Sequence, residues 1–166
     1  MKIGIIGNGF VGNAINQNFK DHYQTIIYDS NPERSTVESI CELCSVAGIV
    51  FVAVPTPMNE GGICDLSIVL DVVTHISYCN NDNIVIIKST IPPGSCEKIK
   101  KRFTNLRLVF SPEFLTERNA VEDFRTCNRV ILGGDQKVVL MTGDKITVTS
   151  NTASSADVIM SFLEIT

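Results

Sequence analysis

The sequence lacks an excess of basic residues, and it lacks any long apolar run. Its 166 residues include 14 lysines and arginines against 18 aspartates and glutamates, which gives a formal net charge of -4. Proteins that bind nucleic acid or anionic membranes through a basic surface show the opposite balance. No apolar stretch approaches the roughly 20 residues that cross a bilayer. We therefore expect neither a nucleic-acid partner nor a membrane partner.

The chain also lacks the pattern of a secretory leader. Met1 leads directly into the strand-like segment Lys2-Ile3-Gly4-Ile5-Ile6, with no basic segment and no cleavage site. We therefore expect a cytoplasmic protein whose cysteines are reduced thiols rather than disulfides. The six cysteines are Cys41, Cys44, Cys64, Cys79, Cys96 and Cys127.

Cysteines and histidines are not spaced as a metal site. Cys41 and Cys44 form a lone CxxC pair, with no second pair and no neighbouring histidine to complete the ligands of a zinc ion. We expect no bound metal, and we expect this pair to lie on a helix as small apolar residues. A redox or metal role is the alternative.

Short apolar runs, rich in Ile and Val, recur along the chain. Near-continuous hydrophobicity of this kind is typical of strands that are covered on both faces. The predicted strands are Ile3–Ile6, Thr25–Tyr28, Ile49–Val54, Ile84–Ile87, Leu106–Phe110 and Arg129–Leu132.

The segments between these runs suit crossover helices. The predicted helices are Val11–Phe19, Thr36–Ala47, Leu66–Tyr78 and Ser95–Phe103. Alternation of strands and helices predicts βαβ units and therefore an α/β fold, a doubly wound (Rossmann-type) parallel sheet with helices on both faces.

The pattern is less clear after Gly133-Gly134. Residues 136–141 and 145–149 are two short strands in one interpretation, and a short helix followed by a last strand in the other. A final helix is predicted from Ser154 to Ile165, with a Ser or Thr cap. We assign residues 1–134 to one domain and residues 135–166 to an atypical tail.

A glycine-rich turn follows the first predicted strand. Gly7-Asn8-Gly9-Phe10-Val11-Gly12 has the GxGxxG spacing of dinucleotide-binding turns, and it lies between a strand and a helix as that mechanism requires. Gly7 permits the tight turn, Gly9 lets the backbone approach a pyrophosphate, and Gly12 allows close helix–strand packing. The N–H groups at the start of the helix then face the phosphates.

An acidic residue ends the second predicted strand. Asp29 lies about 20 residues beyond the turn, where a carboxylate accepts hydrogen bonds from the adenosine ribose hydroxyls. Its charge would repel the 2′-phosphate of NADP, so NAD is the expected cofactor. Arg34 is close enough to weaken this preference, or it lines the adenine side. A structural glycine turn beside an unrelated aspartate is the alternative.

Three further segments follow the third, fourth and fifth predicted strands. In a doubly wound sheet, loops of this kind emerge at the carboxyl edge, beside the cofactor crevice. Prolines stiffen these turns, and Thr56, Ser89 and Thr90 bring hydroxyl groups to the same edge.

Four motifs occur in order along the chain: the glycine turn, Val52-Ala53-Val54-Pro55-Thr56-Pro57, Lys88-Ser89-Thr90-Ile91-Pro92-Pro93-Gly94 and Ser111-Pro112-Glu113-Phe114-Leu115. Together they resemble the amino-terminal NAD-binding domain of the UDP-glucose/GDP-mannose 6-dehydrogenase family. The resemblance spans about residues 1–134. It implies oxidation of the C6 hydroxyl of a nucleotide sugar to a carboxylate, with two NAD molecules and a cysteine thiohemiacetal. A UDP-sugar is the expected substrate.

The resemblance also implies residue roles. Phe10, Val11, Asp29, Arg34 and Thr56 would contact NAD, and Thr90 would hold a water or the cofactor near the reacting carbon. Glu113 would be the acid/base carboxylate, working through that water. Phe114, Leu115 and Glu117 would touch the sugar nucleotide or the nicotinamide side. Without the resemblance, Glu113 and Glu117 are also explained as acids that stabilise a helix dipole.

The tail departs from the family pattern. The family's central helix opens with Ala-Glu-x-x-Lys and an Asn one turn later, but Met160 stands at the lysine position and Glu164 at the asparagine position. The sugar-nucleotide domain and its Gly-Gly-x-Cys segment are absent from the sequence. Loss of one preorganised charge donor typically lowers the rate by about 10²–10³. We therefore predict little or no activity from this chain alone.

Several interpretations remain open from sequence. The chain is part of a nucleotide-sugar 6-dehydrogenase, completed by a second chain, or it is a non-catalytic NAD-binding module. Another small NAD-linked dehydrogenase, of the hydroxyacid or 6-phosphogluconate type, is less consistent with the segment from Lys88 to Gly94. A homodimer is a further expectation, since an apolar patch exposed without the missing domain favours self-association.

Overall fold

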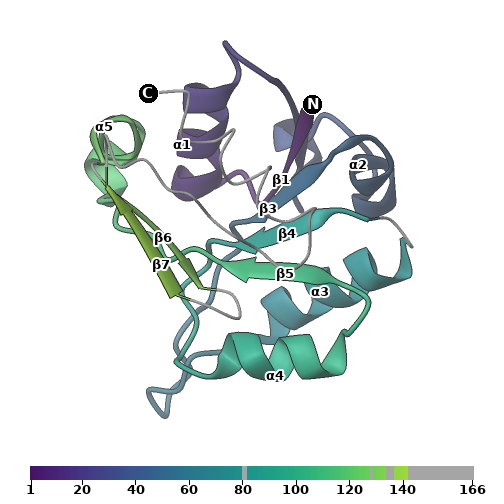
Figure 1. The fold of residues 1–166 in the computed structure, drawn as a ribbon, viewed down its shortest axis with the longest axis vertical. Coiled ribbons are helices and arrows are strands. Elements are labelled where there is room, and N and C mark those ends of the chain that lie inside the picture. The colour runs from purple at the N-terminus through teal and green to yellow at the C-terminus, as the bar shows by residue number, and fades with distance from the viewer. Residues whose placement is uncertain (80–81, 128, 134–136, 142–166) are drawn as a thin grey trace.

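Seven strands form one sheet within residues 1–79, 82–127, 129–133 and 137–141, which the computed structural model describes. The strand order is β2-β1-β3-β4-β5-β6-β7. Figure 1 shows the sheet running through the middle of the molecule. The strands are β1 (Lys2–Ile6), β2 (Gln24–Tyr28), β3 (Ile49–Val52), β4 (Ile84–Ile87), β5 (Arg107–Phe110), β6 (Arg129–Gly133) and β7 (Lys137–Met141).

The first five strands are parallel, and they confirm the doubly wound α/β fold. Each pairs with its neighbours in continuous register, so that Ile6 lies beside Tyr28 and Val52, and Ile87 beside Phe110. Parallel neighbours require a crossover connection, which the intervening helices supply. Because the strands run the same way, the segments that follow β1, β3, β4 and β5 all emerge at one edge.

The last two strands are antiparallel, so the expectation of a wholly parallel sheet is wrong there. Gly133 of β6 pairs with Phe110 of β5, and β6 pairs along its length with β7. An apolar run predicts a strand but gives no direction, which is set by the connecting segment. Only residues 134–136 separate β6 from β7, and a connection that short joins antiparallel neighbours. Of the predicted tail, residues 135–136 and 142–166 lie outside the described part of the chain.

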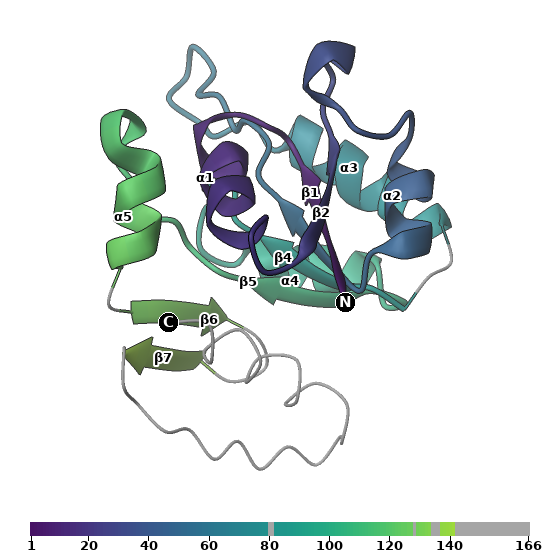
Figure 2. The ribbon, with the colours of Figure 1, turned by 90° about the horizontal axis from the view of Figure 1, so that it is seen from above.

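Helices cover both faces of the sheet, as Figures 1 and 2 show. Helices α1 and α5 pack on one face, where Asn18 of α1 donates a hydrogen bond to the carbonyl of Val121 in α5. The other face carries α2, α3 and α4. Within the described residues, no helix is long and apolar enough to cross a membrane. The helices are α1 (Phe10–Phe19), α2 (Ile40–Val46), α3 (Ser67–Tyr78), α4 (Ser95–Arg102) and α5 (Ala120–Thr126), with short 3-10 turns η1 (Pro32–Arg34) and η2 (Glu117–Asn119).

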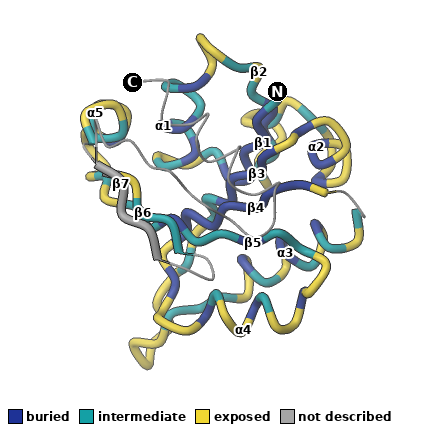
Figure 3. The backbone as a smooth tube through the Cα atoms, viewed as in Figure 1, coloured by how far each residue is buried: buried dark blue, intermediate teal, exposed yellow. Residues whose placement is uncertain are grey.

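The core consists of two apolar layers, one on each side of the strands. Ile3 and Ile5 of β1 point into the layer beneath α1, whereas Ile6 belongs to the layer beneath α2, α3 and α4. This alternation explains why the strand sequences are apolar at nearly every position. In Figure 3 the strands β1, β3 and β4 form the buried centre, and the outer turns of the helices are exposed.

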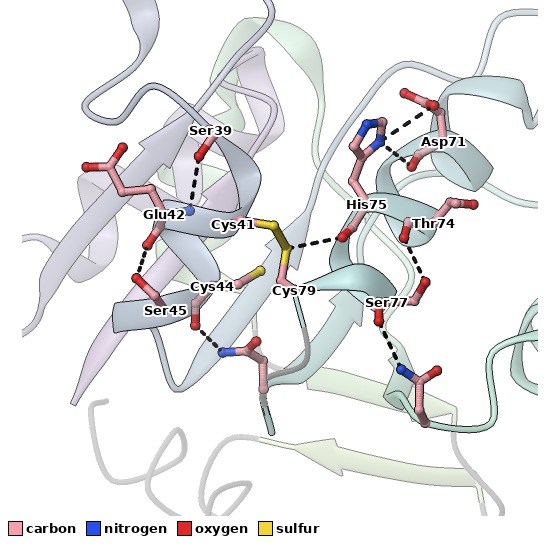
Figure 4. The surroundings of a disulfide bond; sticks show 12 residues. Ser39, Cys41, Glu42, Cys44, Ser45, Asp71, Thr74, His75, Ser77 and Cys79 are labelled. Atoms are coloured by element: carbon pink, nitrogen blue, oxygen red, sulfur yellow. Dashed lines mark hydrogen bonds and ion pairs between the residues drawn. A yellow bond between two sulfur atoms is a disulfide. The ribbon is translucent and has the colours of Figure 1, made fainter.

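A disulfide joins Cys41 of α2 to Cys79, the C-cap residue directly after α3 (Figure 4). The expectation of reduced thiols is therefore wrong for this pair. That expectation rested on the predicted cytoplasmic location, which does not indicate how close Cys41 and Cys79 lie in the fold. Helices α2 and α3 pack in the same layer and bring residues 38 apart in sequence to a Cα–Cα distance of 5.1 Å.

The second cysteine of the CxxC pair behaves as predicted. Cys44 lies on α2 and is only 2% exposed, within the core. Burial raises the pKa of its thiol from 9.0 to about 11. This thiol therefore favours the native state up to about pH 9, and the contribution is lost as the pH rises towards 11.

The thiol of Cys44 should react slowly with an alkylating reagent while the chain is folded. The pKa of this thiol is 9.0 in the unfolded chain and about 11 in the native chain. At pH 8 the thiolate fraction is therefore about 100-fold lower in the native chain. Iodoacetamide labelling, read by peptide mass spectrometry with and without urea, measures the ratio. Equal rates in both conditions would show that the thiol is not buried.

Candidate cofactor and acid/base site

The glycine turn between β1 and α1 has the backbone geometry that its motif predicts. Gly7 has φ +92°, and its N–H donates to the carbonyl of Tyr28 at 2.9 Å. A Cβ at Gly7 would stand 2.6 Å from the carbonyl oxygen of Ala53, and a Cβ at Gly12 would overlap the carbonyl oxygen of Gly7. Only glycine fits at either position, because backbone atoms cannot move aside.

Gly9 leaves an open space at the start of α1. Nothing lies within 4 Å of the position where its Cβ would be. As the N-cap residue it offers no side chain to the helix, and the first turn of α1 has no acidic residue. The N–H groups there are therefore available to an anion, which fits a pyrophosphate. Phe10 is 49% exposed beside this space, and Val11 is half-buried.

Asp29 follows β2 and lies directly against the glycine turn. Its Oδ2 accepts the N–H of Asn8 at 2.6 Å, and its Oδ1 accepts the N–H of Asn31 at 2.8 Å. The Ser35 hydroxyl accepts the Asp29 N–H and donates to the Asp29 carbonyl. The carboxylate is thus fixed against the glycine turn.

Asn8 connects the glycine turn to the segment after β2. Its side-chain amide donates to the carbonyl of Arg34 at 3.1 Å, whereas the Arg34 side chain is exposed. Sequence reasoning missed Asn8, because the middle position of a GxG turn accepts most residues. The only available signal was its amide group, which can bridge two backbone segments.

The turns after β3 and β4 are joined by a serine. The Ser89 hydroxyl is buried and donates to the carbonyl of Val54 at 2.8 Å. Thr56 is half-buried, and Thr90 is exposed at the same edge of the sheet. The Thr90 carbonyl lies 3.8 Å from the thiol of Cys64, which donates to it. Thr56 and Thr90 thus lie where the sequence places them.

Glu113 turns inward from the segment that follows β5. Its Oε2 lies 3.0 Å from Nζ of Lys88, and the two side chains are only 12% and 9% exposed. Its Oε1 accepts the N–H of Phe114 at 2.9 Å. The carboxylate is therefore held at the carboxyl edge, beside the end of β4. In the sequence Lys88 is only one residue of a motif. Its spacing from Glu113 does not predict that the two side chains form an ion pair.

The helix-dipole explanation is wrong for Glu113. Residues 111–116 are irregular, and the first helical turn after them, η2, begins only at Glu117. Glu117 is exposed and does begin this short turn, so the structure places the two acids in different surroundings. Phe114 is 52% exposed, and Leu115 is half-buried.

Thr116 fixes the far end of this segment. Its N–H and its hydroxyl both donate to Oδ2 of Asp123 in α5. These two hydrogen bonds lower the pKa of the Asp123 carboxyl below its usual 3.8. Their contribution is therefore present at neutral pH and is lost as the pH falls through the lowered pKa. The segment that carries Glu113 is thus held at both ends.

A family model described as the UDP-glucose/GDP-mannose dehydrogenase family, NAD binding domain, matches residues 34–149. The chain belongs to this family. The matched range begins after the glycine turn and Asp29. The assignment of these earlier residues to the cofactor site therefore rests on their geometry. NAD is the cofactor that the family assignment gives, and the open space at Gly9 and the fixed carboxylate of Asp29 fit it.

Known proteins resemble parts of the chain. A UDP-glucose 6-dehydrogenase of Rickettsia bellii is 41% identical over 93 residues, which cover 53% of this chain and 21% of that protein. The UDP-glucose 6-dehydrogenase of Campylobacter jejuni is 31% identical over 174 residues, or 87% of this chain and 44% of that one. This chain therefore spans less than half the length of these relatives.

Solved structures share the fold. A UDP-glucose dehydrogenase from Pyrobaculum islandicum superimposes with a TM-score of 0.72 at 24% identity, covering 81% of this chain and 41% of that one. A GDP-mannose dehydrogenase from Pseudomonas aeruginosa gives a TM-score of 0.68 at 19% identity, covering 80% and 41%. At this level of identity the likeness shows a common fold.

Proposed function

We propose that the chain is the NAD-binding part of a nucleotide-sugar 6-dehydrogenase that oxidises the C6 hydroxyl of a UDP-sugar towards the uronic acid. The observation that carries this proposal is the buried carboxylate of Glu113 at the carboxyl edge, in a chain of this family whose glycine turn fits a dinucleotide. Relatives named UDP-glucose 6-dehydrogenase support the substrate class.

The chain's own residues have distinct tasks in this reaction. Gly7, Gly9 and Gly12 shape the turn for the pyrophosphate, and Asp29 accepts hydrogen bonds from the ribose hydroxyls. The family resemblance implies four further cofactor contacts, from Phe10, Val11, Arg34 and Thr56. NAD, when bound, accepts the hydride from the sugar.

Proton transfer and sugar binding use the segments after β4 and β5. Glu113 takes the proton of the C6 hydroxyl through a water, and Thr90 positions that water with its hydroxyl. A general base of this kind contributes roughly 10²–10⁴ in rate. Phe114, Leu115 and Glu117 contact the sugar nucleotide or the nicotinamide side. Phe114 and Glu117 are exposed and Leu115 is half-buried, so all three are accessible to a ligand.

Residues 1–134 form the cofactor domain in this proposal, and residues 135–166 form the tail. The proposed partners are a complementing chain that carries a sugar-nucleotide domain with a nucleophilic thiol, or a second copy of this chain in a homodimer. The protein works in the cytoplasm. The alternative is a non-catalytic NAD-binding module, which Met160 and Glu164 favour, because neither can replace the charge donor and amide of the family pattern.

NADH formation by the purified chain tests the proposal against this alternative. The chain at high concentration is offered NAD and a panel of nucleotide sugars, and Glu113→Gln is assayed in parallel. Turnover with a UDP-sugar that Glu113→Gln abolishes at unchanged NAD affinity supports the dehydrogenase. A flat trace from a chain that binds NAD supports the non-catalytic module. Normal turnover of Glu113→Gln would remove Glu113 from the chemistry.

Replacing Asp29 by Ala should weaken NAD binding by roughly 10–100-fold, because hydrogen bonds to a charged acceptor contribute about 1.5–3 kcal/mol. NADP binding should be less affected, since the repulsion of its 2′-phosphate is also removed. Calorimetric titration of both cofactors measures the two changes, with Asp21→Ala, an exposed acid after α1, as the matched control. Equal affinities before and after the change would contradict the assignment of Asp29.

A further inference from the structure

Lys88 is a buried charge at the point where β4 ends. The residue is only 8% exposed, and lysines are almost never buried this far without partners. Its ammonium group has three donor hydrogens and no acceptor. Three acceptors lie around it: Oγ of Ser111 at 3.4 Å, the carbonyl of Pro112 at 3.4 Å, and Oε2 of Glu113 at 3.0 Å.

These three acceptors are consecutive residues of the turn that follows β5. The turn begins where the N–H of Ser111 donates to the carbonyl of Ile87, the last residue of β4. One ammonium group therefore holds the first three residues of this turn from the neighbouring strand. Oε2 of Glu113 makes no directed hydrogen bond within the described residues, so the ammonium holds it by charge.

Stability alone does not account for this pair. Replacing a buried ion pair by apolar residues of similar volume is often neutral or stabilising, because desolvation of two charges opposes their attraction. The surrounding core offers such an environment, since β4 and the layer beneath it are apolar. The buried charge of Lys88 is therefore better explained by its effect on the Glu113 carboxylate.

We propose that Lys88 is a positioning residue that fixes the carboxylate of Glu113 for proton transfer. With Oε2 held by the ammonium and Oε1 by the N–H of Phe114, the side chain has one orientation at the carboxyl edge. An acid or base must lie within hydrogen-bond reach of the proton it moves, and a misplacement of about 1 Å lowers the rate by about 10²-fold. This inference rests on the proposed role of Glu113.

The first test measures how firmly Glu113 is held, and it needs no turnover. The intact chain is treated with a carbodiimide and glycinamide, and labelling of each carboxyl is followed by peptide mass spectrometry. In Lys88→Met, labelling of Glu113 relative to the exposed Glu117 should rise by about tenfold. Lys88→Arg, which keeps the charge, should recover part of the protection. The NAD dissociation constant should stay unchanged, which shows that the variant is folded.

The second test separates positioning from structure. Where NADH formation is measurable, Lys88→Met should lower kcat by about 10²-fold at unchanged KM for NAD. Unchanged labelling of Glu113 in Lys88→Met, or an unchanged kcat, would overturn the proposal. A wild-type chain without turnover would count against the proposed function only, and the labelling ratio would still decide whether Lys88 holds Glu113.

Discussion

Lys88→Met should lower the free energy of unfolding by about 3 kcal/mol, one of the largest effects of any single side-chain change in this chain. Removing one partner of a buried ion pair leaves an uncompensated charge, which typically costs about 3–5 kcal/mol. The lower value applies because the Glu113 side chain is 12% exposed and can rotate towards water. Urea denaturation followed by circular dichroism measures the change.

Two variants show whether the effect belongs to the pair. Lys98→Met removes an exposed lysine of α4 and should change the free energy of unfolding by less than about 0.5 kcal/mol. The double variant Lys88→Met/Glu113→Leu should regain most of the loss, because no charge is then left unpaired. If Lys88→Met were as stable as Lys98→Met, the charges of Lys88 and Glu113 would not be coupled in solution.

Loss of the disulfide should lower the free energy of unfolding by about 4 kcal/mol. The bond closes a loop between residues 38 apart, and a loop of that length restricts the unfolded chain by about this amount in the chain-entropy description. The effect is measured by urea denaturation of the oxidised chain with and without a dithiol reductant. The Cys41→Ser/Cys79→Ser variant should match the reduced chain.

A free cysteine provides the control for the disulfide. Cys64→Ser changes a half-buried thiol outside the bond and should leave the response to the reductant intact. The reduced chain should keep its secondary structure, because Ile40 and Leu43 anchor α2 in the core independently of the sulfur atoms. Equal stability of the oxidised and reduced chains would show that Cys41 and Cys79 are not bonded in solution.

The parallel part of the fold was predictable because it depends on local patterns. Apolar runs such as Ile84–Ile87 are typical of strands covered on both faces, and the segments between them are long enough for crossovers. Helix α5 was not predicted, since Ala120–Thr126 is short and has one buried residue. The direction of β6 depends on how α5 packs beside α1, which no run of residues reveals.

The candidate site was predictable at the residues whose role is local. Gly7 and Gly12 are required by backbone overlap, which a spacing pattern captures directly. Contacts between distant residues were not accessible in this way. The Lys88–Glu113 pair and the Cys41–Cys79 bond depend on which strands and helices become neighbours, and each joins residues 25 or more positions apart.

Calorimetric titration of the purified chain with NAD and with NADP tests the central claim most directly. The open turn at Gly9 and the carboxylate of Asp29 predict saturable binding of one NAD per chain, and weaker binding of NADP because its 2′-phosphate meets that charge. A folded chain that bound neither dinucleotide, or that bound NADP more tightly than NAD, would contradict the account.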